Sequence, residues 1–359
     1  MMYGPAGFWS RIARAGLALG CLTSLLAGCC KMASLPPLQV MMNGRVSAEL
    51  PPVQNACPLM EMPLPGSCPD GNACKVAIID VDGLLVNVDL TGPGSMGENP
   101  VSLFRERLDK AACDPLVKGV VVRINSPGGG VTASDIMRHD LLAFKQRCGL
   151  PVAACVLDVG AGGAYYLATA ADQIFIHPTS VTGGIGVILN VYNLQDAMAQ
   201  FNILGTPVKS GQHIDLGTPL TPLNEERKRL LQDMADEFHA RFRRVVSESR
   251  PDVSQVDDTN FDGRVFTAAQ AMSRRLVDHV GYLEDAVEWC RASAGSDGIR
   301  VVLYHRSNDP ARTPYALTPN VPWHGSLIPF SLPGLDRSRL PGFLYMWQPD
   351  PTFEKVGGR

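Results

Sequence analysis

The sequence predicts an α/β protein with a mainly parallel, twisted sheet and flanking helices. Three observations support this: apolar β-branched runs of strand length recur, amphipathic stretches of helix length separate them, and glycine-rich segments follow two of the runs. Parallel strands need crossover connections, so this alternation favours helices packed on one sheet. Sites in such sheets form where strands end at their carboxyl side.

The apolar runs define the strands, and the stretches between them define the helices. Strands are expected over Val76–Val86, Val117–Asn125, Val152–Val159 and Gln173–Ile176. Helices are expected over Val101–Ala112 and Thr132–Gln146, and from about Gly163.

A longer helix is expected over residues 222–249, because apolar residues recur there every three or four positions. Thr221 is its expected N-cap, and Pro222 suits the first helical position.

Composition and charge exclude two classes of protein. The 359 residues include 32 Lys and Arg against 35 Asp and Glu, and a formal charge of −3 argues against electrostatic nucleic-acid binding. Hydrophobic residues make up 45% of the chain, enough for a sizeable core. No apolar run after the N-terminal segment reaches the roughly 18 residues of a spanning helix, which excludes a multi-span membrane protein.

The N-terminal segment has the order of a secretory signal. Arg11 and Arg14 precede the apolar run Ala15–Gly28. The tetrapeptide Leu26–Cys29 (LAGC) then resembles a bacterial lipobox, which implies cleavage before Cys29 and a lipid on its thiol. We therefore expect an exported lipoprotein anchored to a membrane of the bacterial cell envelope, with an ordinary signal or an uncleaved anchor as the alternatives.

Ten cysteines occur, and an oxidising compartment would permit disulfides among them. Cys113 and Cys148 each lie near the end of an expected helix just before a strand, so a bridge between them is one candidate, although the sequence leaves the connectivity open. A zinc site is disfavoured because no paired CxxC with histidine partners appears. We expect neither a metal nor a cofactor.

Changes in composition divide the chain into four parts. Residues 1–28 are the expected signal peptide, and residues 29–74, which contain Pro and Cys, read as a linker and extended arm. Residues 75–295 carry the strand and helix pattern. Residues 296–359 form a tail rich in Pro and aromatic residues.

Two glycine-rich segments follow strands. Asn125–Val131 (NSPGGGV) is expected to be a turn whose amides, at Gly128 and Gly129, are uncovered and point at a developing oxyanion. Asp158–Leu167 (DVGAGGAYYL) begins like a dinucleotide fingerprint, but Tyr165 stands at the third glycine position, so a Rossmann site is rejected.

In this order the segments resemble those of the signal peptide peptidase A-like serine peptidases, family S49 of the ClpP/crotonase superfamily. The resemblance covers about residues 75–290. It is carried by Arg123–Ser134 (RINSPGGGVTAS), Asp158–Ala168 (DVGAGGAYYLA), Ala170–Val187 (AADQIFIHPTSVTGGIGV) and Asp262–Val287, and Leu340–Trp347 resembles the family's C-terminal apolar segment. It implies a ClpP/crotonase-type fold, peptide substrates and a homo-oligomer.

The resemblance also places a Ser/Lys dyad on residues that cannot perform its chemistry. The nucleophile position falls on Gly162, and the base position falls on Ile214 within Ser210–Asp215. The amides of Gly128, Gly129 and Gly163 remain as oxyanion-type donors. We therefore expect a catalytically impaired, membrane-tethered homologue that keeps a peptide-binding groove and acts as a scaffold or regulator.

Two alternatives stay open. One is an active serine endopeptidase that cleaves membrane-associated peptide remnants through a relocated dyad, for which Ser126 and Lys209 are the possible substitutes. Against it, Lys209 lies five residues before Ile214, and Ser126 suits turn scaffolding. The other is an acyl-CoA enzyme of the crotonase type, but no carboxylate pair lies near Gly160–Tyr166.

Overall fold

The computed structural model describes residues 57–64, 73–91, 95–203, 205–253, 258–295, 298–320 and 342–349. The expected signal peptide (residues 1–28), the lipidation residue Cys29 and most of the expected linker lie outside the described residues. None of the helices in the described ranges combines the length and apolar character needed to cross a membrane.

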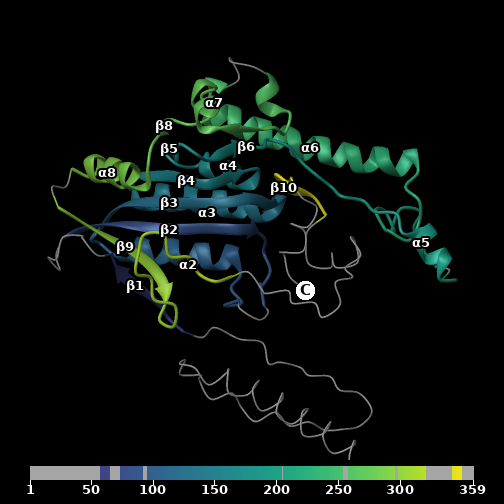
Figure 1. The fold of residues 1–359 in the computed structure, drawn as a ribbon, viewed down its shortest axis with the longest axis horizontal. Coiled ribbons are helices and arrows are strands. Elements are labelled where there is room, and N and C mark those ends of the chain that lie inside the picture. The colour runs from purple at the N-terminus through teal and green to yellow at the C-terminus, as the bar shows by residue number, and fades with distance from the viewer. Residues whose placement is uncertain are drawn as a thin grey trace, which may run out of the picture. The chain divides into compact units, whose positions relative to one another are not determined.

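Strands of the described residues form one ten-stranded sheet, with the main order β1-β9-β2-β3-β4-β5-β8 (Figure 1). Their bounds are β1 Leu59–Pro63, β2 Cys74–Leu85, β3 Val117–Gly130, β4 Val152–Ala161, β5 Gln173–Ile176, β6 Val181–Gly183, β7 Val265–Thr267, β8 His279–Val280, β9 Ile299–Arg306 and β10 Leu344–Met346. The central pairings from β9 through β8 are parallel, whereas β1 with β9, β6 with β7 and β10 with β3 are antiparallel. The predicted α/β class with a mainly parallel sheet is confirmed.

Helices cover both faces of this sheet. Their bounds are α2 Pro100–Cys113, α3 Val131–Cys148, α4 Gly163–Ala168, α5 Gln195–Gln200, α6 Glu225–Ser249, α7 Ala268–Ser273 and α8 Leu283–Ser293, with a 3-10 turn η2 at Asp258–Phe261. Alternate residues of β3 face the two layers: Val120 and Val122 pack in the cluster that contains Phe144 of α3, and Val121 packs in the cluster that contains Cys290 of α8. Burial on both faces explains why the strand is almost continuously apolar.

The start of α6 differs from the prediction. Asn224, not Thr221, is the N-cap, and its side chain accepts a hydrogen bond from the amide of Arg227 at 2.8 Å. Because the helix begins at Glu225, Thr221 lies three residues before the N-cap, and its hydroxyl accepts a bond from the Arg227 guanidinium.

The glycine segment Asn125–Val131 also differs from the prediction. Residues up to Gly130 continue the strand instead of forming a turn. The reason is pairing on both sides: Leu84 and Leu85 of β2 pair with Gly128 and Gly129, and β10, which lies far away in sequence, pairs with Gly128–Gly130. Cys113 and Cys148, one candidate pair for a disulfide, are both free thiols in the structure.

The segments that flank the expected central domain contribute to its sheet. From the expected tail, β9 lies between β1 and β2, with Cys74–Ile78 of β2 pairing with Ile299–Leu303 in parallel. From the expected arm, β1 pairs with β9 in antiparallel fashion. The boundaries near residues 74 and 295 therefore do not separate the sheet from its surroundings.

Candidate active site

Gly162 occupies a sharp turn between β4 and α4. Its backbone has φ 54° and ψ −123°, a conformation that residues with a side chain adopt only under strain. The turn is held on both sides, because the Gly162 amide donates to Gly183 O and its carbonyl accepts from Tyr166 N, each at 2.9 Å. A strained strand-to-helix turn of this kind presents the nucleophile in several hydrolases. Here the position carries no side chain.

The end of β3 lies beside this turn and is internally bonded. Ser126 is fully buried; its hydroxyl donates to Gly83 O at 2.6 Å and accepts from the Gly128 amide at 3.1 Å. The Gly128 N–H is thus already bonded, and the Ser126 hydroxyl serves the backbone. On the other side, a Cβ on Gly129 would lie 2.6 Å from Leu85 N, so β2 and β3 approach each other too closely for a side chain there.

Strand β10 covers this end of β3. Trp347 N donates to Pro127 O at 2.9 Å, and Leu344 and Ile188 exchange two backbone bonds of 2.9 and 3.0 Å. In the ladder, Tyr345 lies opposite Gly129. The apolar C-terminal segment noticed in the sequence therefore lies over the candidate site, which the sequence did not predict.

Tyr345 fastens β10 to the helices. The side chain is fully buried, and its hydroxyl donates to Phe238 O at 2.7 Å. Its ring lies 4.6 Å from that of Phe242 and 5.4 Å from that of Tyr166. Burial, together with the bond that the Tyr166 hydroxyl donates to Asp135, raises the pKa of Tyr166 to about 12, so this phenol stays protonated. The aromatic group joins β10, α4 and α6.

The base position lies on a different part of the molecule. Ile214 is 71% exposed. Figure 1 shows α5 and the segment after it beside the start of α6, to one side of β3 and β4. Lys209, the possible substitute base, is held by Asp215 at 2.8 Å, and Arg227 contacts the same carboxylate at 2.9 Å. Within this chain, the structure does not bring Lys209 and Ser126 together.

Arg123, the first residue of the first motif, belongs to a buried ion cluster. Its guanidinium contacts Asp80 at 2.8 Å, and both side chains are at most 3% exposed. Arg107 and His305 reach the same carboxylate at 3.5 and 3.2 Å. This cluster joins neighbouring strands β9, β2 and β3 to α2, and it is structural support that the sequence did not reveal.

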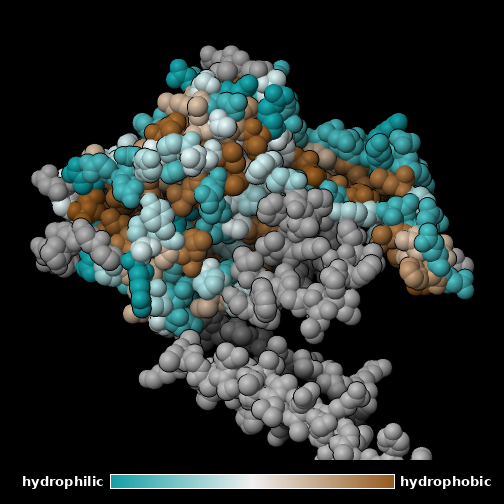
Figure 2. Space-filling view, viewed as in Figure 1, coloured by the Kyte–Doolittle hydropathy of each residue, from teal (hydrophilic) through white to brown (hydrophobic). Residues whose placement is uncertain are grey.

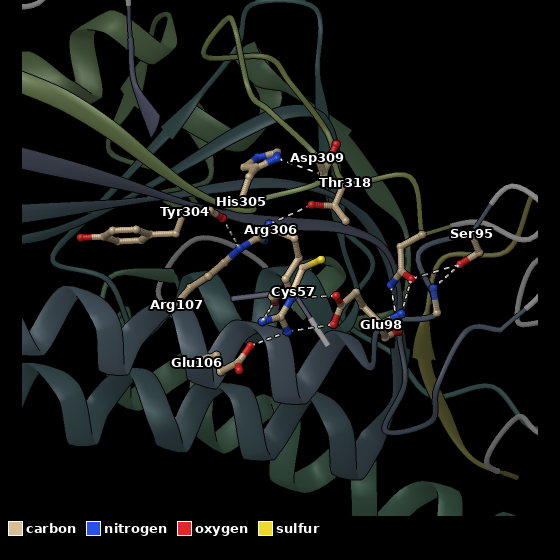
Figure 3. Close-up of polar contacts among 12 residues, drawn as sticks. Cys57, Ser95, Glu98, Glu106, Arg107, Tyr304, His305, Arg306, Asp309 and Thr318 are labelled. Atoms are coloured by element: carbon tan, nitrogen blue, oxygen red, sulfur yellow. Dashed lines mark hydrogen bonds and ion pairs between the residues drawn. The ribbon is translucent and has the colours of Figure 1, made fainter. Parts of the chain in front are cut away.

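Figure 3 shows how β9 and α2 are held together beside this cluster. Arg306 contacts Glu98 at 2.8 Å and Glu106 at 2.6 Å. A second contact runs from α2 to β9: Arg107 of α2 donates to the Tyr304 carbonyl of β9 at 3.0 Å. The expected tail is therefore anchored by charges to the body of the protein.

Two neighbouring carboxyls respond to burial in opposite ways. Burial raises the pKa of Asp80, but Arg107, His305 and Arg123 more than offset it, so that the pKa lies below its usual range. Burial and the adjacent Asp80 charge raise the pKa of Asp82 to about 7. Asp82 also lines a cavity of about 390 Å³, together with Gly83 and Asn125. Asn125 is the residue directly before Ser126.

The two buried cysteines of the described residues are poor candidates for a substitute nucleophile. Cys155 and Cys290 lie in the core, where burial raises the pKa of each thiol to about 12. Such thiols stay protonated and are poor nucleophiles. Among the described residues there is no group of three or more His, Cys, Asp or Glu that could hold a metal ion.

The sequence is similar to those of known proteins over its central part. A model described as peptidase family S49 matches residues 144–297, a range that includes Gly162 and Ile214. The chain is 28% identical to a putative signal peptide peptidase SppA of Enterococcus faecium, over 60% of this chain and 62% of that protein. It is 33% identical to a putative protease of Methanocaldococcus jannaschii, over 55% of this chain and 63% of that protein.

A further relative is protease 4 of Salmonella typhi, 28% identical over 59% of this chain and 33% of that protein. The chain thus covers less than two thirds of each of these three relatives. A solved structure of a membrane-bound stomatin-specific protease overlaps 60% of this chain and 84% of its own, at 11% identity and a TM-score of 0.37.

Proposed function

Because the chain belongs to peptidase family S49, we propose that it is a catalytically impaired relative of the serine peptidases in that family. In this role it uses its peptide-binding site as a scaffold or as a regulator and does not cleave what it binds. The relatives above are described as peptidases. The proposal is therefore that this chain has lost peptidase activity while keeping a sequence similar to theirs.

One observation carries the proposal: the residue at the strained turn between β4 and α4 is Gly162. A serine peptidase needs an oxygen nucleophile at such a turn and a base that takes its proton. Glycine supplies no nucleophile, and the exposed Ile214 supplies no base. Oxyanion donors alone typically contribute a factor of about 10²–10³, and one of the expected donors, the Gly128 amide, is already bonded to Ser126.

The rival function is cleavage through a relocated dyad of Ser126 and Lys209. The contacts of both residues disfavour it, because the Ser126 hydroxyl is bonded to the backbone and the Lys209 amine is paired with Asp215. A general base must lie within hydrogen-bond reach of the hydroxyl whose proton it takes, whereas the Lys209 amine is bonded to both carboxylate oxygens of Asp215.

Purified protein tested with a fluorogenic peptide and with a fluorophosphonate probe for reactive serines separates the two functions. We expect no labelling and background cleavage from the native chain, with Ser126→Ala and Lys209→Ala giving the same result. Cleavage that either substitution abolishes would establish the rival. The companion variant combines Gly162→Ser with Ile214→Lys. It tests whether restoring the nucleophile and the base is enough to restore peptide cleavage.

A lipid on Cys29 and export to the bacterial cell envelope complete the proposal. They are supported by the LAGC tetrapeptide after a charged and then apolar segment. Anchoring of this kind would keep the peptide-binding site close to a membrane surface, where a scaffold for membrane-associated peptides is needed.

A homo-oligomer is also part of the proposal. Large apolar side chains are exposed around α5 and the segment after it, including Phe201 at 77%, Ile203 at 56% and Val208 fully. Figure 2 shows apolar surface on this projecting part and along α6. Such surface in a soluble domain favours self-association. Light scattering on the purified domain checks it, and a monomer at micromolar concentration would contradict it.

A further inference from the structure

The peptide bond between Tyr345 and Met346 lies directly over Gly162. A Cβ built on Gly162 would lie 2.7 Å from the carbonyl carbon of Tyr345 and 2.9 Å from the amide nitrogen of Met346, with the Tyr345 oxygen nearer still. The atoms of one peptide bond thus stand where the side chain of a nucleophile would begin.

The same carbonyl faces the other glycines of the site. A Cβ on Gly163 would lie 3.3 Å from Tyr345 O, and one on Gly128 would collide with it. Gly128 and Gly163 also approach each other, since that Gly128 Cβ would lie 2.8 Å from Gly163 N. The Tyr345 carbonyl is therefore aimed at the region of the expected oxyanion donors.

Strand β10 reaches this place in the form of a bound peptide. It is extended and antiparallel to Gly128–Gly130, and it bonds through its backbone to Pro127 on one side and Ile188 on the other. Adding an extended segment to a sheet in this way is a common mode of peptide recognition. Leu344 and Met346 pack with Leu84, Val86 and Leu90, so the contact is apolar.

From this geometry we infer that residues 342–349 are a substrate-like strand of the chain itself, which fills the acyl-transfer site in cis. The inference rests on the proposed function, because it takes Gly162 as the nucleophile position. The site then admits a second extended, apolar peptide only when β10 leaves, and the missing side chain at Gly162 is what lets the strand settle so closely.

Hydrogen exchange on the full chain tests whether β10 is seated over Gly162. Gly162→Ala places a methyl group against β10, whereas Gly149→Ala is a matched control: Gly149 also has a positive φ of 64°, but a Cβ there meets nothing within 4 Å. We expect Gly162→Ala to speed amide exchange in Leu344–Trp347 about tenfold or more, and Gly149→Ala to leave it unchanged. Rapid exchange of these amides in the native chain would overturn the inference.

Peptide binding tests whether the covered site accepts an extended segment. Leu344→Pro removes the bond from the Leu344 amide to Ile188 O and leaves the walls of the site intact. The probe is a fluorescent peptide with the sequence of residues 342–349 (GFLYMWQP), measured by anisotropy. We expect saturable binding to Leu344→Pro and binding at least about tenfold weaker to the native chain, since the cis strand competes. The control, Val208→Pro at a fully exposed position, should behave like the native chain.

Each outcome decides the point. Equal binding to the native chain and Leu344→Pro, or no binding to a folded Leu344→Pro, would refute the inference. If Leu344→Pro does not fold, the exchange comparison of Gly162→Ala with Gly149→Ala decides alone. Neither experiment measures peptide hydrolysis, so the two proposals can fail independently. If the serine probe labels a protein whose β10 amides are protected from exchange, the proposed function is refuted, but the inference that β10 lies over Gly162 is not.

Discussion

The carbonyl carbon of Tyr345 lies so close to Gly162 that a Cβ there would stand 2.7 Å from it. Two residues 183 positions apart in the chain are thus close together in space, at the position where the sequence resemblance to the S49 serine peptidases places a nucleophile. The glycine and the strand depend on each other: a side chain at 162 and β10 in its present place exclude one another.

The free energy of unfolding should show that a side chain at position 162 and β10 exclude one another. Gly149→Ala should cost about 1–2 kcal/mol, the usual penalty of a side chain at left-handed φ. Gly162→Ala pays a similar penalty and also overpacks against β10, so we expect it to cost about 1–3 kcal/mol more. Urea unfolding of both variants checks this, and equal losses would contradict it.

The hydroxyl of Tyr345 should contribute measurably to the fastening of β10. Tyr345→Phe loses the bond to Phe238 O and should lower the free energy of unfolding by about 1 kcal/mol. Tyr304→Phe is the matched control, because within the described residues the buried Tyr304 hydroxyl has no hydrogen-bond partner. Its removal should be neutral or slightly stabilising. Thermal unfolding that shows the reverse order would contradict the assignment.

Removing one partner from the buried ion cluster should strongly lower the free energy of unfolding. Arg123→Met leaves the Asp80 carboxylate without its shortest ion pair, and we expect a loss of about 3–5 kcal/mol. Arg105→Met removes ion pairs of a side chain that is 50% exposed and should cost less than about 1 kcal/mol. Denaturant midpoints of the two variants test the contrast.

The pH dependence of stability should carry the signature of Asp82. Its pKa is about 7 in the folded protein against 3.8 for the free side chain, so between these values the folded state binds a proton that the unfolded chain has lost. This contribution to stability is therefore lost as the pH rises through 7. Asp82→Asn removes the ionisation, so relative to the native chain it should gain about 1–3 kcal/mol between pH 5 and pH 8.5.

Asp80 titrates in the opposite sense. Its pKa is lowered below 3.8, so its contribution is present above that value and is lost as the pH falls further. Unfolding curves at pH 3, 5 and 8.5 separate the two carboxyls. A native chain and an Asp82→Asn variant that run parallel from pH 5 to pH 8.5 would contradict the raised pKa of Asp82.

The lipid anchor gives the final prediction. Cys29→Ser removes the thiol that the LAGC tetrapeptide offers for lipidation, so the protein should move from the membrane to the soluble exported fraction. Cys30→Ser is the adjacent control and should leave the partition unchanged. Fractionation followed by immunoblotting measures it, and a Cys29→Ser protein that stays in the membrane would indicate an uncleaved anchor.

Much of the fold could be predicted from the sequence because its determinants are local. The β-branched runs became β2, β3, β4 and β5, since a strand buried on both faces must be apolar throughout. Their ends shifted by two residues at most, except that β3 runs on to Gly130. The position of Gly162 could be predicted too, because an ordered set of motifs surrounds it.

Tertiary structure alone decided what covers the site and what supports it. Leu344–Met346 is a three-residue strand, too short to show a period, and the Gly128–Gly130 segment has no side chains that would favour an extended form. The two segments pair with each other across more than two hundred residues, and Gly128 and Gly129 pair on their other side with Leu84 and Leu85 of β2. The cluster of Asp80, Arg123 and His305 likewise forms only when β9 docks beside β2, because the pairing of buried charges depends on where distant strands meet and not on any local pattern.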